Sequence, residues 1–299
     1  MTESTKVGFI GLGNMGAPMA ANVAHSGFDL IVRDTDQNLA SEIAYASGAV
    51  AASSPSDFAE VEIVVTMLPT STIVSQALFD WGDGVVHHLA PDAVIVDMSS
   101  SDPTQTKELG KILKCHGIAL IDAPVSGGVS KATTGELSIM LGCDNAEAII
   151  KALPIVESMS SVIFRTGDLG SGHAMKALNN FVAAAATTAA CEALVIGDRF
   201  GLDQHTILDV LNSSTGRSWV TENVLGPHVV DREYGSGFSL ALYSKDVGIA
   251  KNLAAAVDDP APVCTAVASA MTSALSTLGN VDHTEAITFW EQERITTGT

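Results

Sequence analysis

A glycine-rich turn between an apolar run and a helical pattern constrains the fold of this chain most. Gly11, Gly13 and Gly16 form G-x-G-x-x-G directly after the apolar residues VGFI and directly before a segment with helical spacing. Such glycines allow a tight turn, the approach of a pyrophosphate to the backbone, and close packing of the helix on the strand. The pattern predicts a dinucleotide site, and we include Asn14 and Met15 among its cofactor-binding residues.

Asp34 strengthens this prediction, because it closes the next strand 18 residues after Gly16. A carboxylate at that place accepts hydrogen bonds from an adenosine ribose. Its charge repels a 2′-phosphate, and the next residue is Thr35 rather than an arginine that would clamp one. NAD is therefore favoured over NADP. Arg33 argues the other way, although a residue before the acid projects to the other side of the strand.

Apolar runs and helical patterns alternate through the first half of the chain. This alternation predicts an α/β fold that begins with a Rossmann domain, whose parallel sheet is covered on both faces. After Gly167 only helical segments follow, and the first, at about 172–200, would span roughly 40 Å. We therefore predict an NAD-binding Rossmann domain at 1–166 and an all-helical substrate and dimerisation domain at 167–299, joined through the long helix.

The second half of the chain should contain further helices, because glycine and proline mark breaks between helical patterns. The stretch at 181–197 is rich in alanine but contains Glu192, and its apolar core is short for a membrane span. We expect a buried helix there instead. The other helices are expected at about 203–212, 217–231, 239–257, 261–278 and 283–293.

Composition excludes several classes of protein. The chain has 299 residues, 46% of them apolar, and a formal net charge of −19, so it can bury a large core but lacks a basic surface for nucleic acid or anionic membranes. The first residues show no export signal, which favours a cytoplasmic location. The cysteines lack metal-ligand spacing, so we expect no metal site and treat all four as buried apolar residues: Cys115, Cys143, Cys191 and Cys264.

Lys176 and Asn180 are the strongest candidates for catalysis. They stand four residues apart in GSGHAMKALNNF, and a helix brings positions i and i+4 onto one face. Reduction of a carbonyl by hydride leaves charge on oxygen, which a positioned cation can stabilise or protonate. A lysine whose pKa is lowered by burial or by another cation, for which Lys245 is a candidate, can serve as the base in the reverse direction.

With these motifs the chain resembles the β-hydroxyacid dehydrogenases, a family that includes 3-hydroxyisobutyrate dehydrogenase and tartronate semialdehyde reductase. The resemblance runs from about Lys6 to Trp290 and rests on four motifs in order. They are GFIGLGNMGAPMAANV at 8–23, DAPVSGG at 122–128, GSGHAMKALNNF at 170–181 and SKDVGIA at 244–250.

The resemblance implies a role for each matching residue. Lys176 looks like the family's proton donor and acceptor, and Asn180 looks like its partner at the substrate oxygen or carboxylate. Ser126, with the backbone of Gly127 and Gly128, looks like the grip on the substrate carboxylate. Phe238 lies in a segment that covers the substrate in relatives. Lys245 with Asp246 looks like the pair that reaches over the cofactor. Further candidates for contact with the nicotinamide lie at carboxyl strand ends: Met67, Leu68, Pro69 and Ser99.

The resemblance predicts an NAD-dependent oxidoreductase that transfers a hydride between a small 3-hydroxy acid, similar to 3-hydroxyisobutyrate, and its semialdehyde. Alternatives are a reductase of tartronate semialdehyde or another short semialdehyde, and an imine reductase, which commonly lacks this lysine. A dinucleotide-binding scaffold without turnover has no need for Lys176, Asn180, Ser126 and Lys245 together. We expect a small carboxylate substrate and a homodimer or homotetramer, because the alanine-rich long helix offers apolar surface to a second copy.

Overall fold

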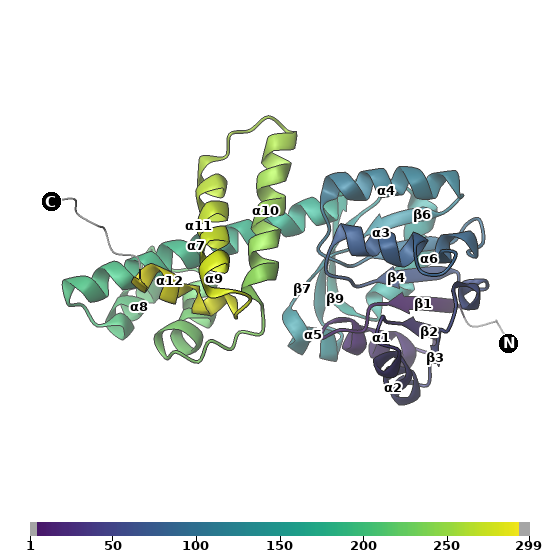
Figure 1. The fold of residues 1–299 in the computed structure, drawn as a ribbon, viewed down its shortest axis with the longest axis horizontal. Helices are drawn as coiled ribbons and strands as arrows, with labels where there is room; N and C mark the ends of the chain where they lie inside the picture. The colour runs from purple at the N-terminus through teal and green to yellow at the C-terminus, as the bar shows by residue number, and fades with distance from the viewer. Residues whose placement is uncertain (1–4, 293–299) are drawn as a thin grey trace. The chain divides into compact units, whose positions relative to one another are not determined.

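The computed structural model describes residues 5–292 and has two compact units, with the division between Lys176 and Ala177. The first unit contains a nine-stranded sheet with its helices, and the second is helical (Figure 1). The predicted fold class is confirmed. The domain boundary between 166 and 167 stays a prediction, because helix α7 (Ser171–Phe200) begins in the first unit and ends in the second.

The sheet of the first unit is mostly parallel. Its strands are β1 (Lys6–Ile10), β2 (Asp29–Arg33), β3 (Val50–Ala51), β4 (Ile63–Thr66), β5 (Val94–Asp97), β6 (Ala119–Asp122), β7 (Val125–Ser126), β8 (Leu137–Gly142) and β9 (Ser160–Gly167). Strands β3-β2-β1-β4-β5-β6 run parallel in that order. β8 differs from the expected parallel arrangement, because it pairs antiparallel with β6 and β7. The link from β7 to β8 is shorter than a parallel crossover requires.

Helices cover both faces of this sheet. Alternate residues of a strand point to opposite sides, and because the buried strands are apolar on both sides, both faces must be covered. Ile63 and Val65 pack on the side of α1 and α2, whereas Val64 packs on the side of α3 and α4, and all three are fully buried (Figure 1). Each such side chain stabilises the fold by about 1.5–3 kcal/mol. The helices of this unit are α1 (Gly16–His25), α2 (Gln37–Ser47), α3 (Ser71–Phe79), α4 (Pro103–Cys115), α5 (Gly128–Thr134) and α6 (Ala146–Glu157), with 3₁₀ turns η1 (Pro55–Phe58) and η2 (Val85–His87).

The second unit packs helices around its own core. It contains most of α7, then α8 (Gln204–Ser213), α9 (Trp219–Asn223), η3 (Gly226–Val230), α10 (Leu240–Ala256), α11 (Pro262–Leu278), η4 (His283–Ala286) and α12 (Ile287–Gln292). Helices α10 and α11 lie side by side (Figure 1). Leu194, Leu225, Met271 and Ile287 are fully buried in one cluster, which shows that distant helices share this core.

Two of the predicted helices differ from the structure. The helix expected at 217–231 is broken: α9 ends at Asn223 and a π-helical turn follows from Gly226. Pro227 explains the break, because it has no backbone N–H to donate to the preceding turn. The helix expected at 283–293 begins as the 3₁₀ turn η4, and its last residue lies outside the described range.

Helix α7 is long and apolar enough, by length and composition alone, to cross a membrane. A single helix of this kind is weak evidence, since the core helix of a soluble protein passes the same test. Ala184, Cys191 and Leu194 of α7 are buried in the core of the second unit, which supports the expected buried helix.

The cysteines follow the sequence expectation with one exception. Cys143, Cys191 and Cys264 are buried, but Cys115 is exposed on the last turn of α4. It stands two positions after the buried Leu113, and two helical positions turn a side chain to nearly the opposite face. The expectation that Cys115 is buried is therefore wrong.

Candidate active site

The glycine turn after β1 has the shape that a bound pyrophosphate needs. A Cβ on Gly11 would lie 2.3 Å from the Met67 carbonyl oxygen, and one on Gly16 would lie 1.9 Å from the Gly11 carbonyl oxygen. A Cβ on Gly13 would meet nothing within 4 Å, and this residue is exposed. The outer glycines thus close the turn, and the middle one leaves its backbone open. No side chain caps α1, so its N-terminal amides can take an anion from outside.

Asp34 is fixed beside this turn by the backbone. One carboxylate oxygen accepts a hydrogen bond from the Leu12 N–H at 2.7 Å, and the other accepts one from the Asp36 N–H at 3.0 Å. The residue directly follows β2, at the carboxyl edge of the sheet. The structure therefore brings Asp34 to the glycine turn with its carboxylate already oriented.

Arg33 points elsewhere. Its guanidinium carbon lies 4.4 Å from the centroid of the Trp81 ring, in a cation–π contact. Burial lowers the pKa of Arg33, and Asp34 partly opposes that effect. The Arg33 guanidinium is therefore bound by an aromatic side chain of the protein itself.

Two further strand ends meet near the turn. The Leu68 N–H, after β4, donates to the Ser99 Oγ, after β5, at 2.9 Å. Met67 and Leu68 are half-buried and Pro69 is exposed, whereas Ser99 is fully buried. The Ser99 side chain therefore holds this edge together, and its predicted contact with the cofactor stays a prediction.

The segment predicted to hold the substrate carboxylate is an exposed turn. Ser126 ends β7 and pairs with Ser138 of β8. Gly127 and Gly128 follow with φ of 138° and 67°, values that disfavour other residues, and both are exposed. A Cβ on Gly128 would meet nothing within 4 Å, whereas one on Gly127 would lie 2.7 Å from the Lys131 side chain, so the turn leaves Gly128 open and Gly127 packed against Lys131.

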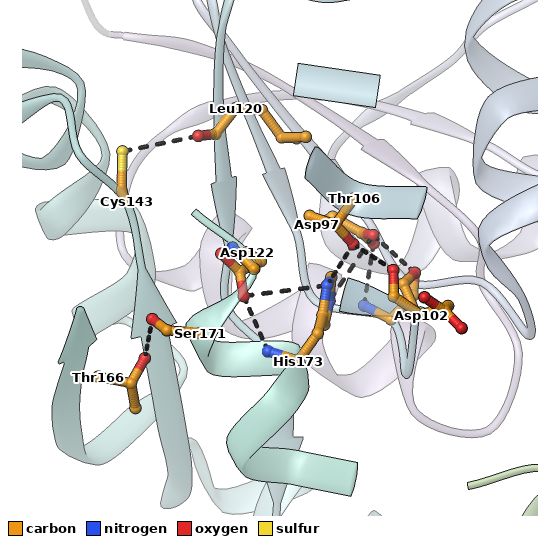
Figure 2. Close-up of polar contacts among 12 residues, drawn as sticks. Asp97, Asp102, Thr106, Leu120, Asp122, Cys143, Thr166, Ser171 and His173 are labelled. Atoms are coloured by element: carbon orange, nitrogen blue, oxygen red, sulfur yellow. Dashed lines mark hydrogen bonds and ion pairs between the residues drawn. The ribbon is translucent and has the colours of Figure 1, made fainter. Parts of the chain in front are cut away.

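A buried carboxylate fixes the start of α7 (Figure 2). Asp122, the fully buried last residue of β6, accepts hydrogen bonds from the Gly170 N–H at 2.7 Å and the His173 N–H at 2.8 Å. Burial raises the pKa of Asp122, and the interactions with His173 and the two amides partly offset this rise. The helix that carries Lys176 thus begins at a defined point on the sheet.

Lys176 and Asn180 lie one turn apart on α7, as predicted. Lys176 is half-buried and Asn180 is buried. In the second unit, the Asn180 Nδ2 donates to Asp246 at 2.6 Å, and the Lys245 Nζ lies 3.2 Å from the other Asp246 oxygen. Asp246 thereby joins the two predicted residues Asn180 and Lys245.

Phe238 belongs to a separate aromatic cluster in the second unit. Its ring contacts Tyr243 and His283 edge to face, with centroids 5.5 and 5.9 Å away. Asp282 fixes this segment by accepting hydrogen bonds from the Gly237 N–H and the Ser236 hydroxyl. Phe238 is half-buried, so part of its ring remains accessible.

Sequence reasoning missed two polar residues that position the site, Asp97 and Asp122, which each end an apolar strand. Asp246, expected from the sequence to reach over the cofactor with Lys245, orients Asn180 from α10. The signal was present, because a carboxylate at the end of an otherwise apolar run is buried only when it has partners. His173 is 1% exposed, which agrees with a structural role.

The described residues fit a dinucleotide. The open Gly13, the uncapped start of α1 and the oriented Asp34 supply the anion site and the ribose acceptor that such a cofactor requires. Within residues 5–292, no group of three histidine, cysteine or acidic side chains is arranged to hold a metal ion.

Both halves of the chain match known families. Residues 6–167 match the NAD binding domain of 6-phosphogluconate dehydrogenase, and residues 170–290 match the family described as NAD-binding of NADP-dependent 3-hydroxyisobutyrate dehydrogenase. The binding of NAD(P) is thereby confirmed, whereas these matches leave the choice between the two cofactors open.

Individual relatives cover most of the chain. A probable 3-hydroxyisobutyrate dehydrogenase of Mycobacterium tuberculosis is 36% identical over 87% of this chain and 88% of its own length. The NAD-dependent L-serine dehydrogenase of Pseudomonas aeruginosa is 35% identical over 86% of this chain and 88% of its own. A structure of M. tuberculosis 3-hydroxyisobutyrate dehydrogenase with L-serine has a TM-score of 0.86 at 32% identity, and covers 96% of this chain and 99% of that one. The chain therefore belongs to the β-hydroxyacid dehydrogenase family and is an NAD(P)-dependent oxidoreductase.

Proposed function

We propose that this enzyme uses NAD to oxidise a small 3-hydroxy acid to its semialdehyde, or catalyses the reverse reduction, with Lys176 as the general acid and base. The observation that carries this proposal is the placement of Lys176 one turn before the buried Asn180, on a helix whose start is fixed by Asp122. The relatives named for 3-hydroxyisobutyrate and L-serine support the substrate class. Both compounds carry a carboxylate and a hydroxyl group on the third carbon.

Each proposed residue has one task. During oxidation, Lys176 takes the proton of the hydroxyl group. NAD, which the glycine turn and Asp34 would hold, would supply the hydride acceptor when bound. During reduction, Lys176 returns the proton to the carbonyl oxygen. Asn180, oriented by its bond to Asp246, donates its remaining amide hydrogen to the substrate. Ser126 and the exposed backbone of Gly127 and Gly128 hold the carboxylate.

The proposed preference for NAD rests on Asp34 and Arg33. The Asp34 carboxylate faces the glycine turn and would repel a 2′-phosphate, and Arg33 is engaged by Trp81. Comparison of kcat/KM for NAD and NADP tests this preference directly. A higher efficiency with NADP would contradict it.

The catalytic assignment is tested with Lys176→Ala. We expect kcat to fall by about 10²- to 10⁴-fold, the usual contribution of acid and base catalysis, because the proton would lose its acceptor. Affinity for NADH, measured by fluorescence, should stay nearly unchanged. Lys111→Ala is a matched control, since Lys111 is an exposed lysine of α4 paired with Glu108. A Lys176→Ala enzyme that kept a tenth of wild-type activity would rule out Lys176 as the acid and base.

The substrate class is tested with a panel of 3-hydroxyisobutyrate, L-serine, glycerate, threonate and 3-hydroxypropionate, each compared with its methyl ester. Free acids should react much faster than esters, because an ester has no charge for the turn at Ser126 to bind. Equal turnover of acids and esters would remove the role of Ser126, Gly127 and Gly128.

The proposed assembly is a homodimer or homotetramer. Exposed apolar side chains lie along α7, including Val182, Ile196 and Phe200, which are 63, 67 and 85% exposed. A surface of this kind favours burial against a second copy. Light scattering over a concentration series tests this proposal, and a stable monomer at micromolar concentration would contradict it.

A further inference from the structure

The first turn of α7 is tied to the sheet by a buried polar network (Figure 2). At its centre is His173 of α7. Its three neighbours come from three other elements: Asp97 ends β5, Asp122 ends β6 and Thr106 lies in α4. These four residues are 0–2% exposed, so their contacts are sheltered from water.

The His173 ring is held by a hydrogen bond to Thr106 and lies beside two carboxylates. Its Nδ1 lies 2.8 Å from the Thr106 Oγ1, and that hydroxyl donates its own hydrogen to the Asp102 carbonyl at 3.0 Å. Nδ1 must therefore carry the hydrogen in the bond to Thr106. The ring also lies between two carboxylates, with Nε2 3.7 Å from Asp97 and Nδ1 3.9 Å from Asp122. The position of the ring is thus set by its hydrogen bond to Thr106 of α4, and the carboxylates at the two strand ends lie beside it outside hydrogen-bond range.

Close backbone packing adds to this fixation. A Cβ on Gly172 would lie 2.1 Å from the Met140 carbonyl oxygen and 2.9 Å from Asp122. A Cβ on Gly142 would lie 2.5 Å from Asp122 and 2.7 Å from the Ser171 hydroxyl. Because not even a methyl group fits at Gly172 or Gly142, the backbone of the first turn of α7 is packed directly on the sheet and has no room to slide.

We propose that Asp122, His173 and Thr106 are positioning residues for Lys176. His173 stands three residues before Lys176, so both side chains lie on one face of α7, one turn apart. A helix transmits a shift of its first turn to the next, and the network therefore sets where the ammonium group meets the substrate oxygen. This inference rests on the proposed role of Lys176 and assigns the groups that make it effective.

The expected size of the effect follows from the geometry that proton transfer needs. A misplacement of 1 Å in a catalytic group can cost about 10²-fold in rate even when the change lies away from the chemistry. Loss of a positioning residue should thus lower kcat more than it changes KM for NAD, since the cofactor turn lies on other elements.

The test compares Thr106→Val with Thr106→Ser. Valine keeps the shape but removes the acceptor for the His173 Nδ1–H, whereas serine keeps a hydroxyl at the same place. We expect Thr106→Val to lower kcat by about tenfold and Thr106→Ser to restore most of that loss, with NADH affinity within about threefold of wild type in both. Asp122→Asn, which turns an N–H toward one of the two helix amides, should lower kcat by about 10²-fold.

An isotope effect separates positioning from general damage. With substrate deuterated at the hydroxyl-bearing carbon, the effect on kcat should rise in Thr106→Val, because the chemical step becomes more rate-limiting. If Thr106 had a merely structural role, its substitution would lower the thermal midpoint and the affinity for NADH. The isotope effect on kcat would then stay at the wild-type value, and kcat would not fall more than KM changes. If Asp122→Asn does not fold, the Thr106 pair decides alone.

The outcomes distinguish this inference from the proposed function. Wild-type kcat in folded Thr106→Val, or an equal loss in Thr106→Ser, would overturn the inference while an inactive Lys176→Ala still supported the catalytic lysine. An active Lys176→Ala would overturn both, because there would be no catalytic lysine to position.

Discussion

Two helices that begin in the first unit, α1 and α7, start at glycine-rich turns and use them in opposite ways. At α1 no side chain caps the helix, and a Cβ on Gly13 would meet nothing within 4 Å. At α7 the Asp122 carboxylate takes the Gly170 and His173 amides, and a Cβ on Gly172 would run into the Met140 carbonyl. One turn is open to an external anion, and the other is filled by an anion of the chain itself.

The difference shows what a glycine before a helix can mean. The amides at a helix N-terminus attract negative charge wherever it comes from. At α1 that charge is left for a ligand, so the turn binds cofactor. At α7 the charge is buried within the protein, so the turn gives the helix a fixed origin.

The largest expected effect comes from filling the closed turn. Gly172→Ala should lower the free energy of unfolding by about 3 kcal/mol or more, because backbone atoms cannot rotate away from the new methyl group. The thermal midpoint of the apoprotein should fall by roughly 6–12 °C. The control is Gly248→Ala in α10, where a Cβ would meet nothing within 4 Å. A Gly172→Ala protein as stable as wild type would break the comparison.

A smaller and more selective effect is expected at the open turn. Gly13→Ala should leave the free energy of unfolding of the apoprotein within about 0.5 kcal/mol of wild type. Affinity for NADH should fall about tenfold or more, or roughly 1.4 kcal/mol, because the methyl group takes the space of the pyrophosphate. Calorimetric titration gives the affinity, and melting of the apoprotein gives the stability. Unchanged affinity would show that the cofactor does not approach Gly13.

The smallest effect is expected at Asp282, which caps η4 in the second unit and lies nearer the surface than Asp122. Burial alone would raise the pKa of Asp282, but hydrogen bonds from His283, Thr284 and Ser236 hold it well below its ordinary value of 3.8. A lowered pKa in the folded state means that the carboxylate stabilises the protein above about pH 4. That contribution is lost as the pH falls through the folded-state pKa.

Asp282→Asn should therefore lower the free energy of unfolding by about 0.5–1 kcal/mol at pH 7, because the amide keeps one acceptor oxygen and solvent screens part of the charge. The difference from wild type should shrink below about pH 4, because the carboxylate becomes protonated first in the unfolded chain and only at lower pH in the folded protein. Thermal melts between pH 7 and 3 measure this. A difference that grew on acidification would contradict the lowered pKa.

Much of the fold and part of the candidate site were predictable from local sequence. The turn at Gly11 to Gly16, Asp34 and the long helix with Lys176 were found because glycine spacing, strand ends and helical periodicity are local signals. The break at Gly226 and Pro227 was overlooked although proline gives a local signal. The exposed Cys115 followed from helical phase, which the cysteine count alone does not reveal.

By itself, the sequence determined the order of elements, the family and the residue types available for chemistry, since periodicity and motif spacing are properties of neighbouring residues. Which glycine turn stays open and which is filled depends on contacts between segments that lie far apart in the sequence. The tertiary structure also showed that Asp97, Asp122 and Thr106 surround His173, and that Asp246 joins Asn180 to Lys245. The contacts of His173 with Asp97, Thr106 and Asp122, and the contact of Asn180 with Asp246, join residues 51 to 76 positions apart. Because no local pattern encodes such pairings, they exist only once the strands have brought their carboxyl ends to one edge.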